Sequence, residues 1–164
     1  MITIKDINNI PEVLNKLNAL KPIKVGILSG GKMLTIGTVH EFGATIKVTP
    51  RMRAFLHSEG LHLKKGTKEI NIPERSFIRA GFDENEQKIT DKIESLILNV
   101  LDKKISTSAF LNFVGEYSAG VFQNYMTDLK EPPLTSFTVL KKGSTNPLID
   151  TGHLRDSITF KILE

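Results

Sequence analysis

The residues whose spacing comes nearest to a chemical motif form one glycine-rich stretch, Gly26-Ile27-Leu28-Ser29-Gly30-Gly31-Lys32-Met33. It has the G-x-x-x-x-G-K spacing of a phosphate-binding loop, in which backbone N–H groups and the lysine hold phosphate oxygens. Met33, however, stands where a Ser or Thr hydroxyl should reach magnesium, and Gly26 falls inside the strand expected before the loop. The regular alternation of parallel strands and helices is also missing. We therefore interpret the stretch as a loop that joins a strand to a helix.

The histidines, carboxylates and serines also lack the spacing that catalysis or metal binding requires. His57 and His62 lie five residues apart in a region without helical pattern, and His40-Glu41 has no second histidine at zincin spacing. Carboxylates gather at predicted helix starts, where negative charge complements the helix dipole. No serine lies in a G-x-S-x-G sequence. We expect no catalytic residue, no metal ligand and no cofactor, and hence no enzyme.

Composition limits the class of protein further. The 164 residues suit one domain over 1–164, and the absence of cysteine suits assembly in a reducing cytoplasm. No apolar run approaches the ~18 residues of a membrane span, and the first residues do not resemble a secretory signal. The 22 basic and 18 acidic residues give a net charge of +4, with the basic residues scattered in pairs. Solvated surface lysines explain this bias, and a small basic nucleic-acid-binding module stays open as an alternative.

The elements that must position these residues follow from hydrophobic periodicity. A stripe from Ile89 to Val100 predicts a long helix that begins near an Asp83–Glu86 capping box, and a second stripe from Phe110 to Leu129 predicts another, capped by Ser106 or Thr107. Shorter helices are expected over residues 7–20, 34–42 and 135–140, and strands over residues 23–28, 45–49, 67–72 and 157–163. This order predicts an α+β fold, with a mostly antiparallel sheet packed against two long helices.

One long segment between two predicted strands has no clear pattern. It extends over about residues 50–68, and we expect it to form a projecting hairpin or loop arm. It mixes basic with apolar side chains, including Arg51, Arg53 and Phe55. That mixture suits contact with a neighbouring subunit, and an unstructured loop explains the same sequence equally well.

Three short segments occur in a set order along the chain. They are Ile36-Gly37-Thr38-Val39-His40-Glu41-Phe42-Gly43, Ile72-Pro73-Glu74-Arg75-Ser76-Phe77-Ile78-Arg79, and Pro147-Leu148-Ile149-Asp150-Thr151-Gly152-His153-Leu154-Arg155-Asp156-Ser157-Ile158. This arrangement resembles the minor tail and tail-completion proteins of tailed bacteriophages, also called virion-morphogenesis or neck proteins. The resemblance spans about residues 25–163. Ser76 departs from it, because many relatives carry proline there, and this should loosen the bend.

The resemblance implies a structural role. It predicts a virion protein of the phage neck, assembled in the host cytoplasm, which forms a homo-oligomeric ring, usually a hexamer in this class. Its partners would be the tail tube, the tail terminator or the head connector, with passing contact between DNA and the ring lumen. A tail terminator that caps the tube is the nearest alternative to a tail-completion or head–tail joining subunit.

The resemblance, with the local patterns, also assigns structural roles to particular residues. We expect His40, Phe42 and Gly43 to fix a helix end, and Pro73, Arg75 and Phe77 to form a bend beneath the long helices. Thr151, Gly152 and Leu154 should fix the terminal turn, with Thr151 capping a short helix. Together with this turn, Arg51, Arg53 and Phe55 should supply contacts between neighbouring subunits, in which one surface meets a different surface.

Overall fold

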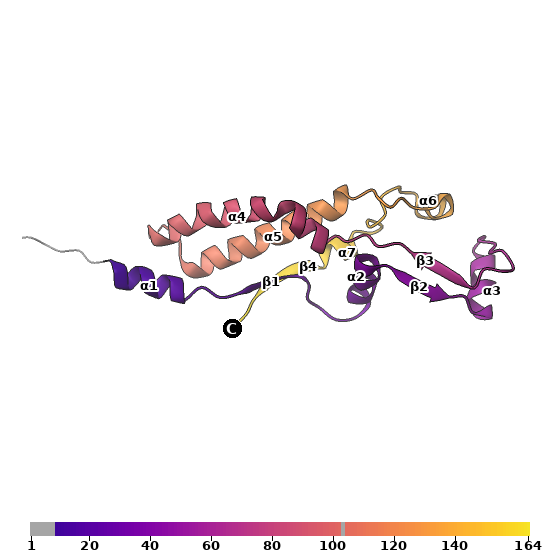
Figure 1. The fold of residues 1–164 in the computed structure, drawn as a ribbon, viewed down its shortest axis with the longest axis horizontal. Coiled ribbons are helices and arrows are strands. Elements are labelled where there is room, and N and C mark those ends of the chain that lie inside the picture. Colours follow the sequence, from indigo (N-terminus) through magenta and orange to yellow (C-terminus); the bar gives the residue numbers. More distant parts are fainter. Residues whose placement is uncertain (1–8, 103) are drawn as a thin grey trace, which may run out of the picture.

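The computed structural model describes residues 9–102 and 104–164, and within these ranges the chain combines seven helices with four strands (Figure 1). The helices are α1 (Ile10–Asn18), α2 (Lys32–Phe42), α3 (Pro50–Ser58), α4 (Arg79–Leu101), α5 (Thr107–Asp128), α6 (Ser136–Lys142) and α7 (His153–Asp156). The strands are β1 (Ile23–Ile27), β2 (Ala44–Lys47), β3 (Glu69–Ile72) and β4 (Ile158–Ile162). The predicted mixed class is confirmed.

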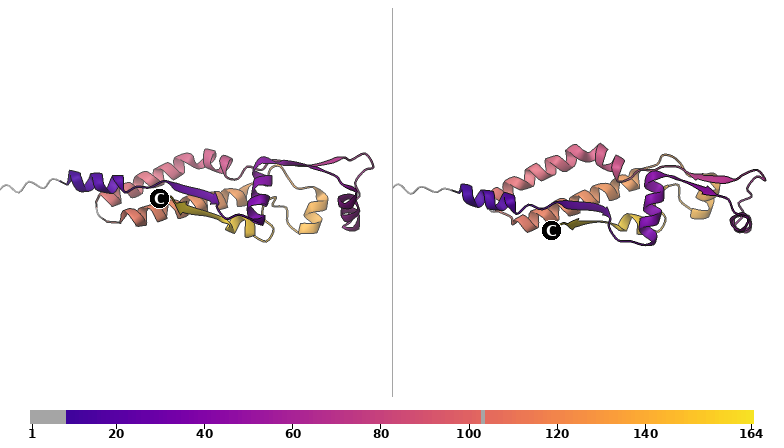
Figure 2. Two further views of the ribbon diagram at one scale, coloured as in Figure 1. Left: turned by 90° about the horizontal axis from the view of Figure 1, so that it is seen from below. Right: turned by 60° about the horizontal axis from the view of Figure 1, so that its bottom comes forward.

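The molecule is long and narrow in all three views (Figures 1 and 2). Helix α1 lies at one end, the α4–α5 pair and the β1–β4 strands follow, and α3 lies at the opposite end. None of the described helices combines the length and apolar character needed to cross a membrane.

The strands pair antiparallel, as predicted, but in two separate sheets. Strands β1 and β4 pair from Ile23↔Ile162 to Ile27↔Ile158, and β2 pairs with β3 from Ala44↔Ile72 to Lys47↔Glu69. The expectation of one sheet is therefore wrong. Each sheet has only two strands and must be stabilised by what packs on it. For β1 and β4 this is α5, which both strands contact.

Helix α5 is the centre of the core. Its buried apolar residues are Phe110, Leu111, Val114, Ala119, Val121, Phe122 and Met126. The predicted stripe from Phe110 to Leu129 includes Phe113, three residues after Phe110, but Phe113 is 51% exposed. The helix is covered by α4 and by β1 and β4, and the buried face that these elements define leaves Phe113 out. Gly115 faces β4 directly, and a methyl group there would collide with the Phe160 ring.

Two predicted helix starts are wrong, whereas Ser106 caps α5 by accepting a hydrogen bond from the Ala109 N–H at 3.1 Å. Helix α4 begins at Arg79, so Asp83 lies in its second turn and caps nothing. Thr151 does not cap α7. Gly152 occupies the N-cap position of α7 with φ +84°, a conformation that threonine would adopt only with strain.

The predicted projecting segment is a hairpin with a helix at its tip. Strands β2 and β3 form the hairpin, and α3 begins where the Thr49 side chain accepts a hydrogen bond from the Met52 N–H at 3.1 Å. Arg53 binds the backbone carbonyls of Leu63, Lys64 and Thr67 and so closes the segment after α3. Residues 44–72 are called the β2–β3 arm below. Of the two forms expected for the arm over about residues 50–68, the structure has the hairpin, and the helix α3 within it was not predicted.

Candidate functional site

The carboxylate of Glu41 organises the contact between the first two sequence segments. It is 6% exposed at the end of α2 and accepts hydrogen bonds from three successive backbone N–H groups at the start of α4. These are the N–H groups of Phe77 at 2.8 Å, Ile78 at 3.0 Å and Arg79 at 3.0 Å. A carboxylate placed there satisfies donors that have no partner within the helix and complements the helix dipole.

Ser76 belongs to the same network. Its hydroxyl donates to a Glu41 carboxylate oxygen at 2.7 Å and accepts from the Ala80 N–H at 3.2 Å. Ser76 therefore holds the bend with two hydrogen bonds that a proline side chain at this position could not make. Burial alone would raise the pKa of Glu41, but the hydrogen bonds from this segment outweigh it and hold the pKa below its ordinary value.

Arg79 covers the network from outside. Its guanidinium bonds a Glu41 carboxylate oxygen at 3.1 Å, the Glu41 carbonyl at 2.8 Å and the Glu74 carboxylate at 2.7 Å. It also lies 4.5 Å above the ring of Phe42. Phe42 is itself 60% exposed, so at this helix end its ring packs against the guanidinium of Arg79 and not in the core.

Arg75 and His40 join the bend to two further parts of the chain. The backbone N–H of the buried Arg75 donates to the His40 carbonyl at 2.7 Å, and its guanidinium donates to the carbonyls of Pro132 at 2.7 Å and Pro133 at 3.1 Å. Arg75 thus links the bend to the segment after α5. Gly43 fits closely beside it: its φ is +69°, and a Cβ there would lie 3.0 Å from backbone atoms of Glu74 and Ile72.

The third segment reaches the same place through the core. Phe77, Leu154 and Ile158 are 1%, 8% and 2% exposed and belong to one apolar cluster. A methyl group on Gly37 of α2 would lie 3.6 Å from both Phe77 and Leu154. The region where residues 40–43, 73–79 and 148–158 meet is called the motif junction below.

Asn146 fixes the start of the third segment. Its side-chain oxygen accepts from the N–H groups of Leu148 and Ile149, each at 3.0 Å, and its amide donates to the Thr127 carbonyl of α5 at 2.7 Å. The sequence predicts a turn here but not this role of Asn146. An Asn before Pro that can bond the backbone two residues on is the signal that could have identified it.

A cleft of about 710 Å³ with both charged and apolar side chains in its lining lies beside the motif junction, between α2, α6 and the terminal turn. It is lined by His40, Lys142, Thr151 and Gly152, among others. The Nδ1 of His40 is buried and has no hydrogen-bond partner among the residues that the structure describes. Burial lowers the pKa of His40, and the nearby charges of Arg75 and Lys142 lower it further, which favours the neutral imidazole. Among the residues described, no group of three or more His, Asp or Glu side chains could hold a metal ion.

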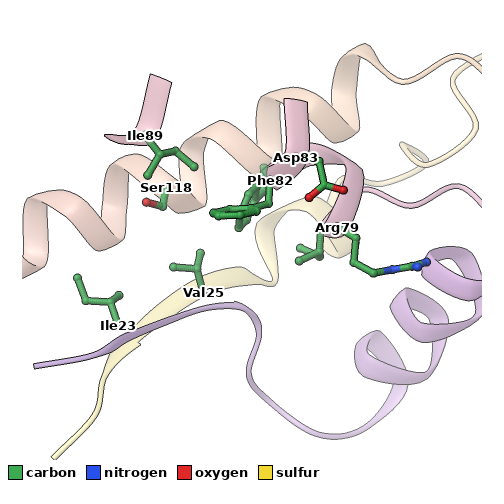
Figure 3. A pocket seen from close by; sticks show the side chains of 9 residues that line it. Ile23, Val25, Arg79, Phe82, Asp83, Ile89 and Ser118 are labelled. Carbon is green, nitrogen blue, oxygen red and sulfur yellow. The ribbon is translucent and has the colours of Figure 1, made fainter. Parts of the chain in front are cut away.

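A second hollow includes residues of α4, and its lining is mostly apolar. This groove of about 560 Å³ lies between β1, α4 and α5. Figure 3 shows Ile23 and Val25 of β1 on one side, Phe82 and Ile89 of α4 on the other, and Arg79 with Asp83 at one end. We call it the α4–β1 groove.

The structure separates the predicted site residues into two groups. One group belongs to the motif junction and consists of His40, Phe42, Gly43, Pro73, Arg75, Phe77, Thr151, Gly152 and Leu154. Arg51, Arg53 and Phe55 lie on α3 at the tip of the β2–β3 arm. Glu41 was not among the predicted site residues, although its carboxylate lies two residues before the glycine expected to end the helix. The chain matches no protein-family model, no curated protein and no solved structure.

Proposed function

We propose that this chain is a structural subunit of the neck of a tailed bacteriophage, a tail-completion or head–tail joining protein. Its copies would form a ring, a hexamer in the class that it resembles, between the tail tube and the head connector. The proposal places the protein in the virion after assembly in the host cytoplasm, and it assigns no catalytic step to any residue.

The observation that carries the proposal is the exposed area of the isolated chain. The chain exposes 11,382 Å² at a mass of 18.3 kDa. A compact monomer of this mass exposes about 8,100 Å². The nine residues outside the description account for at most about 1,500 Å² of the difference at the value for unfolded chains. An excess of roughly 1,700 Å² remains, close to the two interfaces of about 800 Å² each that a ring subunit needs.

Apolar side chains on this surface support the same proposal. Phe42, Phe55, Phe82 and Leu140 are 43–83% exposed. Single exposed apolar residues are ordinary, but this number on a narrow chain favours burial against other subunits. The motif junction also supports a structural role, because the segments that carry the resemblance make capping and packing contacts within the fold.

Removing the gene from the phage genome that carries it tests the proposal. A tail-completion subunit predicts filled heads and tails of normal length that fail to join. Overlong tail tubes would indicate a tail terminator instead. Joined, infectious particles made without the protein would contradict both roles.

A nucleic-acid-binding function is the second candidate, and one observation favours it. The β2–β3 arm holds six basic and two acidic residues, so the arm accounts for the whole net charge of +4, and the other 16 basic and 16 acidic residues cancel. The basic residues are therefore less scattered than expected. Binding of duplex DNA whose affinity falls steeply with salt would support this role, and absence of binding at low salt would exclude it.

A further inference from the structure

We propose that the tip of the β2–β3 arm of one copy binds in the α4–β1 groove of the next copy, with Phe55 in the groove and Arg51 paired to Asp83. This inference rests on the proposed ring-forming function and assigns both surfaces of its repeated contact. The arm tip and the groove lie at different places on the same chain, so each copy can bind one neighbour through its tip and another through its groove.

The tip presents an apolar side chain beside a positive charge. Phe55 is 61% exposed on α3, and Arg51 lies four residues earlier, on the same face of the helix. Within the described chain Arg51 has no ion-pair partner. The guanidinium of Arg53, in contrast, donates hydrogen bonds to backbone carbonyls of the arm itself. Helix α3 is held in place by the Thr49 cap and the hairpin, so little conformational entropy is lost when its exposed face binds.

The groove presents the complementary surface. Its walls are the side chains of Ile23, Val25, Phe82 and Ile89, and its volume of about 560 Å³ accommodates an aromatic ring with neighbouring side chains. Asp83 stands at the end of the groove beside Phe82 (Figure 3). Asp83 makes no ion pair among the residues described, because Arg79 beside it is bound to Glu41 and Glu74.

The charges of the two elements are opposite over a wider area. The β2–β3 arm has a net charge of +4, whereas residues 83–94 of α4 hold five acidic residues and two lysines. Charge complementarity of this kind orients two surfaces and suppresses wrong pairings. The contact joins two different surfaces, so it propagates from copy to copy and closes when the rotation between copies permits a ring.

Disulfide trapping tests the contact directly, since the 164 residues contain no cysteine. Purified Phe55→Cys is mixed with Phe82→Cys and oxidised, and a covalent heterodimer is expected. The matched control mixes Phe55→Cys with Phe113→Cys. Phe113 is exposed on α5 but lies nine residues before Phe122, on the opposite side of that helix from the groove. Equal trapping in both mixtures would overturn the proposal.

Charge exchange provides the second test. Arg51→Asp and Asp83→Arg should each raise the dissociation constant of self-association at least tenfold, and a chain with both changes should recover most of the loss. Phe55→Ser should weaken association similarly, whereas Leu98→Ser, at an equally exposed position of 61%, should not. Circular dichroism confirms that each variant is folded.

The remaining outcomes separate this contact from the proposed function. Self-association that none of these changes affects overturns the contact, while unjoined heads and tails in the gene deletion still support a neck role. A chain that stays monomeric at every concentration also overturns it. An Arg51→Asp variant that loses affinity for duplex DNA while its self-association is unchanged would also overturn the contact. That result would indicate that the arm binds nucleic acid.

Discussion

The carboxylate of Glu41 accepts the backbone N–H of Phe77 at 2.8 Å across 36 residues of sequence. One side of this contact ends α2, and the other begins the bend into α4. The ring of Phe77 then packs in the core cluster that also contains Leu154 of the terminal segment. The three segments that carry the resemblance to phage neck proteins are therefore parts of one structural unit.

The Glu41 network should be a major source of stability. Replacing Glu41 by Gln removes the charge and turns an amide N–H₂ toward backbone donors, and hydrogen bonds to charged groups contribute about 1.5–3 kcal/mol each. We expect the free energy of unfolding to fall by about 3 kcal/mol, measured by urea titration. Glu74→Gln is the control, because that half-exposed carboxylate shares Arg79 and should cost less than about 1 kcal/mol. Equal losses would contradict a special role for Glu41.

Acid should weaken the fold through the same residue. The pKa of Glu41 in the folded chain lies below its ordinary value of 4.5, so the unfolded chain binds the proton more tightly. The stability that Glu41 contributes is complete above that ordinary value and is lost as the pH falls through the folded-state pKa. Urea titrations at several pH values should show the wild type and Glu41→Gln converging below pH 4.5. Parallel curves would exclude the linkage.

Two glycines of α5 should respond to alanine with opposite signs. A methyl group at Gly115 collides with the Phe160 ring of β4, whereas nothing lies within 4 Å of one at Gly120. Gly115→Ala should destabilise the protein by about 1–3 kcal/mol. Gly120→Ala should stabilise it by about 0.5–1 kcal/mol, because alanine is the better helix former. Thermal unfolding monitors both, and stabilisation by Gly115→Ala would refute the packing of β4 on α5.

Sequence periodicity predicted the elements whose apolar residues recur regularly. Helices α4 and α5 were expected because long stripes such as Phe110 to Leu129 have few alternative explanations. Strand β4 was expected from its alternation. Helix α3 was missed because it is short and has no buried residue, although Thr49 followed by Pro50 is a typical helix start.

Contacts between distant segments could not be predicted in this way. Asp83 and Glu86 have capping-box spacing, yet α4 begins four residues before Asp83, where Glu41 from another helix binds its free N–H groups. Likewise, Gly152 and not Thr151 occupies the N-cap position of α7, because the backbone at that position has a positive φ. Local sequence patterns do not encode a partner that lies 36–38 residues away.

Electron cryomicroscopy of particles made by the genome that encodes this chain tests the central claim most directly. The proposed function predicts density for a closed ring of this chain between the tail tube and the head connector, with α3 of each copy against α4 of the next. Complete, joined particles in which the chain is absent from that junction would contradict it.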